Sequence, residues 1–414
     1  MNKQLITESQ NRDLETIIEE LSKIKEIAGD ALFEAVENRD QKNAKKLIQA
    51  GADVNFVKYN KLTPLMMASR NGQKEIVQAL IDAGAHLDMQ HVLGWTALMI
   101  ASQKDERKEI VQILIKAGAN LDMKNNKGWT ALMIATQNNK KEIVQTLIDA
   151  GANLDIQEED GWTPLMMASR NGQKEIAQTL IKAGANLDVK NNDGITALMF
   201  AAYKGQKEIA QRLIDAGARI DMKNNDGLTA LMVAAHENRK EIFDMLIDKG
   251  AYIDMKNNDG VTALMFAVEN NQKEIAQSLI KGGANLDMQH VSGWTALMLA
   301  VYHKRKDIVS RLLQAGANID MQDKDGKTAL MIAIERKDPV IFQELIMNGA
   351  DVLIKDNQGI DAYHYVMKSG NKKMARIIKG GAKKELSKRK VASQQRGGTA
   401  LQSSLKTKNQ NTLL

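Results

Sequence analysis

The chain has 414 residues, a formal net charge of +6 and no cysteine, and only 4% of its residues are aromatic. The lack of cysteine excludes disulfides, thiol catalysis and cysteine-ligated metal sites. Aromatic residues are too few for a wide globular core, whereas Leu, Ile, Ala and Met can fill thin stacked layers. Lysine outnumbers arginine by 43 to 14, a bias that is typical of AT-rich genomes and favours a bacterial source.

The N-terminal segment, residues 1–29, has the pattern of an amphipathic helix. Its apolar residues recur at helical spacing, at Leu14, Ile17, Ile18, Leu21, Ile24 and Ala28. We expect this helix to cap the repeated segment that follows, because a stack of repeats needs a polar outer surface at its ends. A helix that binds a partner or forms a dimer is the alternative interpretation.

From residue 63 onward, a threonine opens a short apolar segment, Thr-Ala-Leu-Met or Thr-Pro-Leu-Met, at a nearly constant interval. The nine threonines are Thr63, Thr96, Thr130, Thr163, Thr196, Thr229, Thr262, Thr295 and Thr328. Successive threonines are 33 residues apart, except for one interval of 34. Gly-Ala pairs recur with them, from Gly51 to Gly349. A fixed period of this length predicts a solenoid.

Residues 96–128 illustrate one repeat. Residues 97–101 form a short apolar run, and residues 109–115 place apolar side chains on a broad helical face. Gly118 follows where a left-handed C-cap is expected, and a turn-rich stretch ends at Gly128. Each repeat is therefore predicted to be a helix, a turn, a longer helix and a hairpin-like loop. Neither helix can bury its apolar face alone, so neighbouring repeats must stack.

These residues resemble the ankyrin repeat, whose opening motif is Thr-Pro-Leu-His-x-Ala. One opening here reads Thr63-Pro64-Leu65-Met66-Met67-Ala68, and methionine replaces the motif's histidine in all nine openings. Degenerate repeats at Asp30 and Asp361 flank the nine, so the resemblance covers eleven repeats over residues 30–382. It implies an α-solenoid dominated by helices: one elongated ankyrin-repeat stack of helix-turn-helix units with short β-hairpin loops.

The C-terminal segment, residues 383–414, loses the repeat and becomes strongly basic. Eight Lys and Arg residues against Glu385 alone give it a charge of +7, so the residues before it sum to −1 within the chain total of +6. We expect a solvated, disordered tail. The short basic runs 383–384 and 388–390 also allow a nuclear-import or weak polyanion-binding patch. For the repeats themselves we expect no specific binding of nucleic acid.

The sequence offers no constellation for catalysis. The six histidines are scattered along the chain, and neither a His-Glu-x-x-His motif nor a phosphate-binding loop occurs. Aspartates such as Asp122, Asp155 and Asp188 recur at the same position of each repeat, which favours a structural role in turns. We therefore predict no enzyme, no catalytic residue, no metal and no cofactor.

Positions that differ between repeats are the candidates for recognition. The residue before the threonine is tryptophan in four repeats, at Trp95, Trp129, Trp162 and Trp294. The ankyrin resemblance implies that this position lies at the base of the loop, beside a concave groove. The first three would then form a ladder with steps of roughly 10 Å. Tryptophan is enriched in binding hot spots, but an indole can equally pack on its own hairpin or on the next repeat.

A second variable set follows the first helix of each repeat and is expected to line the same groove. Its members are Arg70, Asn138, Arg170, Tyr203, His236, Glu269, Tyr302 and Glu335. Their mixed charges favour a polypeptide partner over a phosphate backbone. The predicted partner-binding residues are Trp95, Trp129, Trp162, Trp294, Arg70, Arg170, Tyr203, His236 and Tyr302.

We predict a non-enzymatic, monomeric scaffold that binds a polypeptide through its concave face. No signal-peptide pattern follows Met1 and no apolar run reaches the length of a membrane span, so we expect a cytoplasmic protein without a span. One alternative is a secreted, host-directed bacterial effector exported without a Sec signal. The other is a structural array without a single partner, which the identity of residues 63–76 and 163–176 favours.

Overall fold

The structure is a computed structural model that describes the backbone of residues 2–379 and, within them, the side chains of residues 16, 17 and 19–379. The chain divides into two compact units, one up to Arg219 and one from Ile220 onward. The predictions for the basic tail, residues 383–414, lie outside the described residues.

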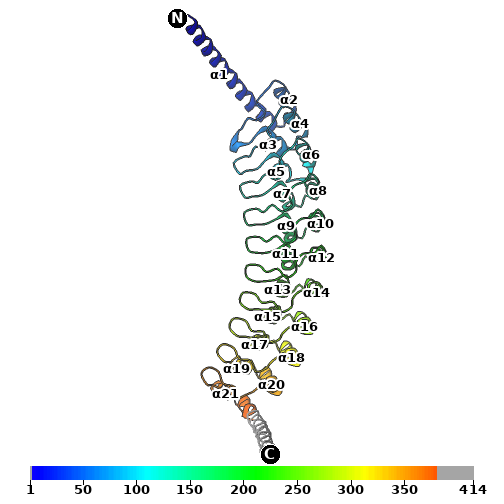
Figure 1. The fold of residues 1–414 in the computed structure, drawn as a ribbon, viewed down its shortest axis with the longest axis vertical. Helices are drawn as coiled ribbons and strands as arrows, with labels where there is room; N and C mark the ends of the chain where they lie inside the picture. The colour runs from blue at the N-terminus through cyan, green and yellow to red at the C-terminus, as the bar shows by residue number, and fades with distance from the viewer. Residues whose placement is uncertain (1, 380–414) are drawn as a thin grey trace, which may run out of the picture. The chain divides into compact units, whose positions relative to one another are not determined.

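The N-terminal unit consists of pairs of helices, one pair in each repeat. They are α1 (Asn2–Glu37), α2 (Gln41–Gln49), α3 (Pro64–Asn71), α4 (Lys74–Asp82), α5 (Ala97–Ala101), α6 (Lys108–Lys116), α7 (Ala131–Gln137), α8 (Lys141–Asp149), α9 (Pro164–Asn171), α10 (Lys174–Lys182), α11 (Ala197–Lys204) and α12 (Lys207–Asp215), with 3-10 turns η1 (Tyr59–Lys61) and η2 (Asp105–Arg107). From α3 onward, the odd-numbered helix of each pair is called the inner helix and the even-numbered one the outer helix, and the loops lie beside the inner helices (Figure 1).

The C-terminal unit continues the same alternation of helices. They are α13 (Ala230–His236), α14 (Lys240–Asp248), α15 (Ala263–Glu269), α16 (Lys273–Lys281), α17 (Ala296–Tyr302), α18 (Lys306–Gln314), α19 (Ala329–Glu335), α20 (Pro339–Met347) and α21 (Ala362–Ser369), and residues 372–379 are also helical. The two units together contain the predicted helix-turn-helix repeats, so the predicted fold class is confirmed.

The recurrent threonine begins a helix because its side chain caps the helix N-terminus. In all nine openings the Thr Oγ1 accepts a hydrogen bond from the backbone N–H three residues on, as Thr130 does from Met133 at 3.3 Å. Such a cap contributes about 1 kcal/mol to stability. The methionine that stands in place of the motif's histidine is at most 3% exposed in every opening. It therefore fills the space between repeats, as a flexible thioether can.

The recurrent aspartate joins each loop to the next one. Asp122 Oδ1 accepts from the backbone N–H of Asn153 at 2.9 Å, and Asp155 Oδ1 accepts from that of Asn186 at 2.8 Å. Asp188 makes the same bond to Arg219 at 2.9 Å. The structural role predicted for these three carboxylates is confirmed, since each holds the backbone of the following repeat.

The loops have the shape of hairpins but are too short to form strands. In the repeat that opens at Thr130, Asn125 N–H donates to Trp129 O at 3.0 Å, and Asn125 Oδ1 accepts from the N–H groups of Lys127 and Trp129. A side chain thus satisfies backbone groups that a longer ladder would pair. Within residues 2–379 the β-structure amounts to two isolated bridges, Lys58–Leu62 and Lys355–Asp361.

Helix α1 runs without a break through the boundary that we predicted at residue 29. Leu32, Phe33 and Val36 near its C-terminal end are fully buried. Farther toward the N-terminus the apolar stripe is solvent-exposed, with Leu21 at 54% and Ile24 at 61%. The part of α1 that carries these exposed side chains projects away from the repeats (Figure 1), whereas its C-terminal end packs against α2 and α3, so the capping role stays a prediction. The alternative of a partner-binding or dimerising helix stays a prediction.

Replacing Leu21 by serine is expected to change the free energy of unfolding by about 0.5 kcal/mol or less. The reason is that Leu21 is already more than half exposed in the folded chain. Urea unfolding of the full chain measures the change. A loss of several kcal/mol would instead mean that the stripe covers the repeats.

Within the described residues, no helix is long and apolar enough to cross a membrane.

Candidate partner-binding site

The nine predicted residues occupy the two positions that the sequence pattern assigned to them. Each tryptophan directly precedes the capping threonine and is partly buried, at the junction of loop and odd-numbered helix. The second set lies at the C-terminal ends of odd-numbered helices, with Arg70 on α3, Arg170 on α9, Tyr203 on α11, His236 on α13 and Tyr302 on α17. All five of these side chains are exposed.

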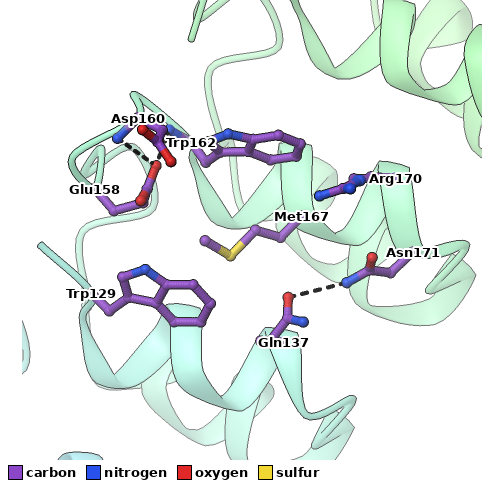
Figure 2. Close-up of a pocket in the computed structure, with 8 residues that line it drawn as sticks. All are labelled: Trp129, Gln137, Glu158, Asp160, Trp162, Met167, Arg170 and Asn171. Carbon is purple, nitrogen blue, oxygen red and sulfur yellow. Dashed lines mark hydrogen bonds between the residues drawn. The ribbon is translucent and has the colours of Figure 1, made fainter. Parts of the chain in front are cut away.

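Two of the tryptophans enclose a cavity in the N-terminal unit. Trp129 and Trp162 come from consecutive repeats and lie on opposite sides of a space of about 290 Å³. Figure 2 shows the side chain of Met167, from α9, between the two indoles. Met167 is only 5% exposed, so the floor of the cavity is fixed by packing. This volume admits one large side chain of a bound molecule.

The ends of the cavity between Trp129 and Trp162 carry opposite charges. The loop end holds Glu158 and Asp160, and the helix end holds Arg170 (Figure 2). Glu158 Oε1 accepts from the backbone N–H groups of Asp160 at 2.9 Å and Trp162 at 3.0 Å. The Arg170 guanidinium lies 5.1 Å from the centroid of the Trp162 ring. Among the described side chains, no ion pair involves these three charged groups.

Trp162 has a packing partner in the following repeat. Its ring stacks on that of Phe200, with centroids 4.2 Å apart and an interplanar angle of 27°. Phe200 is buried in α11, so this stack ties the loop to the next repeat. In the described part of the chain Trp129 has no such ring partner, since Met167 occupies the position equivalent to Phe200. The alternative that the tryptophans serve packing between repeats therefore fits Trp162 better than Trp129.

Trp95 belongs to a second cavity, of about 310 Å³, which shares no lining residue with the first. Its lining includes Arg70 from α3, Ile100 from α5 and the loop residues Val92 and Leu93. Val92 is 46% exposed and Leu93 61% exposed, so apolar surface continues from the cavity onto the tip of the loop. The predicted ladder of three indoles is thus divided between two cavities, one with a more apolar lining that includes Arg70 and one charged at both ends.

His91 forms the turn beneath Trp95 and must be neutral to do so. Its Nδ1 accepts a hydrogen bond from the backbone N–H of Leu93 at 2.9 Å, and its ring is parallel to that of Trp95 at 6.4 Å. A protonated imidazole has no acceptor atom. Burial lowers the pKa of His91 below its ordinary value of 6.5, in agreement with this role.

The His91 loop is expected to lose stability in mild acid. The unfolded chain binds more protons than the folded chain between the lowered folded pKa and about 6.5, so the contribution is complete above about pH 6.5 and falls as the pH drops toward the folded value. Urea unfolding between pH 5 and 8 measures this slope. His91→Asn is the matched control, because Asn125 forms the same turn without titrating. An unchanged slope in His91→Asn would contradict the assignment.

In the C-terminal unit, Trp294 is held by its own surroundings. Its Nε1–H donates to Asp323 Oδ2 at 3.0 Å, and its ring meets that of Tyr302 edge to face at 5.1 Å. The guanidinium of Arg336 lies 4.4 Å from the Tyr302 centroid. His236 instead contacts Phe266, with ring centroids 5.5 Å apart. Trp294 and Tyr302 therefore form one packed cluster, to which His236 does not belong.

Sequence reasoning missed several residues of the Trp129 cavity. From the repeat that opens at Thr130, the residue that lines it is Gln137, whose Oε1 accepts from Asn171 at 3.2 Å, whereas the predicted Asn138 bonds the Ile134 carbonyl of its own helix. Asn138 stands eight residues after Thr130, whereas the other members of the set stand seven after their threonines, so Gln137 is the equivalent position. Glu158 was also missed, although it is visible in the sequence as the one glutamate at a position that other repeats fill with Asn, Asp, His or, before Thr63, Lys.

Among the described side chains, no group of three or more His, Cys, Asp or Glu is placed to hold a metal ion. No protein of curated function matches the sequence significantly. The family model for ankyrin repeats (3 copies) matches residues 32–125, 104–191, 183–257, 250–323 and 307–388. These matches cover most of the sequence and agree with the repeats seen in both units. The chain belongs to the ankyrin repeat family.

Proposed function

We propose that the N-terminal unit binds a polypeptide segment of another protein across the face that Trp95, Trp129 and Trp162 line. Ankyrin repeats are generally protein–protein interaction modules and are typically non-enzymatic scaffolds. Stacked repeats suit this task because they present an extended surface that carries variable residues on a fixed frame.

Trp129 carries the proposal. Its indole is partly exposed, borders a cavity and lacks the aromatic partner that holds Trp162. Other repeats have Leu62 or Leu228 at the same position, so the fold does not require a tryptophan there. A large aromatic side chain that the scaffold does not need is the kind of residue that dominates binding energy at interfaces.

Selection of binders from a random displayed peptide library, with the full chain as target, tests the proposal. We expect enriched peptides that bind the wild type and lose binding to Trp129→Leu. Gln112→Ala is the control, because Gln112 is exposed on the outer helix α6 and its replacement leaves the proposed face intact. Failure to enrich any peptide, or enrichment insensitive to Trp129→Leu, would count against the proposal and favour a structural array without a single partner.

The same experiment applies whether the protein acts in the cytoplasm or as a secreted effector, since we propose the same binding face in both cases.

A further inference from the structure

We propose that the cavity between Trp129 and Trp162 is a subsite for one basic side chain, preferably arginine, of the bound polypeptide. This inference rests on the proposed function, since it names the chemistry of a partner residue at that face. Three features support it: the two indole walls, the surplus negative charge of Glu158, and the balance of charge around the cavity.

The walls suit a flat cation. A guanidinium is attracted to the face of an indole and stacks on it, and a tryptophan is the strongest aromatic partner for such a contact. The Arg170 guanidinium already lies 5.1 Å from the Trp162 centroid, and Trp162 also stacks on Phe200. None of the described cationic side chains lies over the ring of Trp129, so Trp129 offers the open indole face for a ligand cation. The cavity of about 290 Å³, whose floor is the Met167 side chain, leaves room for one further side chain beside the Trp129 indole.

The negative charge of Glu158 is not needed for the turn in which it lies. Its Oε1 accepts from two backbone N–H groups, at 2.9 and 3.0 Å. In the neighbouring repeats the neutral amides of Asn125 and Asn191 accept the same two bonds. The turn therefore requires an acceptor oxygen but no charge, and the charge of Glu158 is available to a ligand.

The balance of charge also favours a cation. Glu158 and Asp160 contribute two negative charges to the lining and Arg170 one positive charge, which leaves a net charge of −1. The side-chain amides of Asn171 and Gln137 also line the cavity, but they are hydrogen-bonded to each other, since Asn171 donates to Gln137. The charged groups are therefore the stronger attraction for a ligand. A basic side chain that enters from the loop end would meet the two carboxylates first and keep its distance from Arg170 (Figure 2).

The experiment uses N-acetyl-L-arginine amide as the probe and N-acetyl-L-citrulline amide as its neutral counterpart of nearly the same shape. The chain has four tryptophans, so four indole N–H signals report binding by NMR, each assigned through a single Trp→Leu variant. We expect the arginine probe to shift the Trp129 and Trp162 signals and leave Trp294 unchanged. The affinity of the citrulline probe is expected to be about fivefold lower than that of the arginine probe, because citrulline cannot form the exposed charge pair.

Two charge variants of the full chain test whether the subsite prefers a positively charged side chain. Glu158→Gln keeps the acceptor oxygen of the turn, and we expect it to weaken the arginine probe about threefold. Arg170→Gln removes a like charge, and we expect it to strengthen the probe by a similar factor. Equal binding of citrulline, no shift of either signal, or weakening by Arg170→Gln would overturn the proposal.

The outcome separates this inference from the proposed function. If displayed peptides bind through Trp129 while the arginine probe does not bind, the subsite is wrong and the peptide-binding face stands. If the probe binds as expected and no peptide is ever enriched, the cavity is a site for a basic group, but its assignment to a bound polypeptide fails together with the proposed function.

Discussion

Gly161→Ala is expected to lower the free energy of unfolding by about 2–5 kcal/mol. Gly161 has a φ of +81°, which costs an L-residue about 1–2 kcal/mol. An added Cβ would also lie 2.8 Å from the backbone nitrogen of Asn192 in the next loop. Since backbone atoms cannot rotate aside, this overlap adds about 1–3 kcal/mol. Urea unfolding of the full chain, followed by circular dichroism, measures the loss.

Gly184→Ala provides the control for Gly161→Ala. Gly184 has a φ of +88°, but an added Cβ meets no atom within 4 Å. We therefore expect only the backbone cost of about 1–2 kcal/mol. Equal losses in the two variants would show that the loops do not pack against one another as closely as the structure indicates.

Trp129→Leu and Trp162→Leu are expected to separate recognition from packing. Trp129→Leu should weaken binding of a selected peptide by about 2 kcal/mol or more and change the free energy of unfolding by about 0.5 kcal/mol or less. Trp162→Leu should in addition reduce stability by about 1 kcal/mol, because it removes the stack on Phe200.

Peptide affinity from calorimetry and stability from urea unfolding, measured on both variants, check this expectation. A large loss of stability with unchanged affinity in Trp129→Leu would show that its indole is a packing residue like Trp162. The scaffold accepts leucine at this position in other repeats, as Leu62 and Leu228 show, so misfolding should not obscure the result.

The repeat architecture was predictable because the same physical requirements recur in every period. A threonine must cap each inner helix, and an aspartate must hold the next loop, so Thr130 and Asp122 could be given structural roles from their spacing alone. The burial of Met133 also followed, because an apolar side chain at a repeated position has to pack between neighbouring repeats.

The candidate site was only partly predictable, because it depends on pairs of residues that the period does not fix. Trp129 and Trp162 occupy equivalent positions, yet one adjoins Met167 and the other stacks on Phe200 of the following repeat. Comparing each tryptophan with the residue four places after the threonine of the following repeat would have separated them, since that residue is Met167 for Trp129 and Phe200 for Trp162. For α1 the sequence contained no such signal, since an amphipathic pattern identifies an apolar face without showing what covers it.

The most direct test of polypeptide binding at the Trp129 face is a titration of the full chain with a selected peptide, followed through the indole N–H signals. We expect the Trp129 signal to shift and saturate with the same affinity that calorimetry gives, while the Trp294 signal stays in place. Tight binding of the peptide with an unchanged Trp129 signal would contradict this expectation.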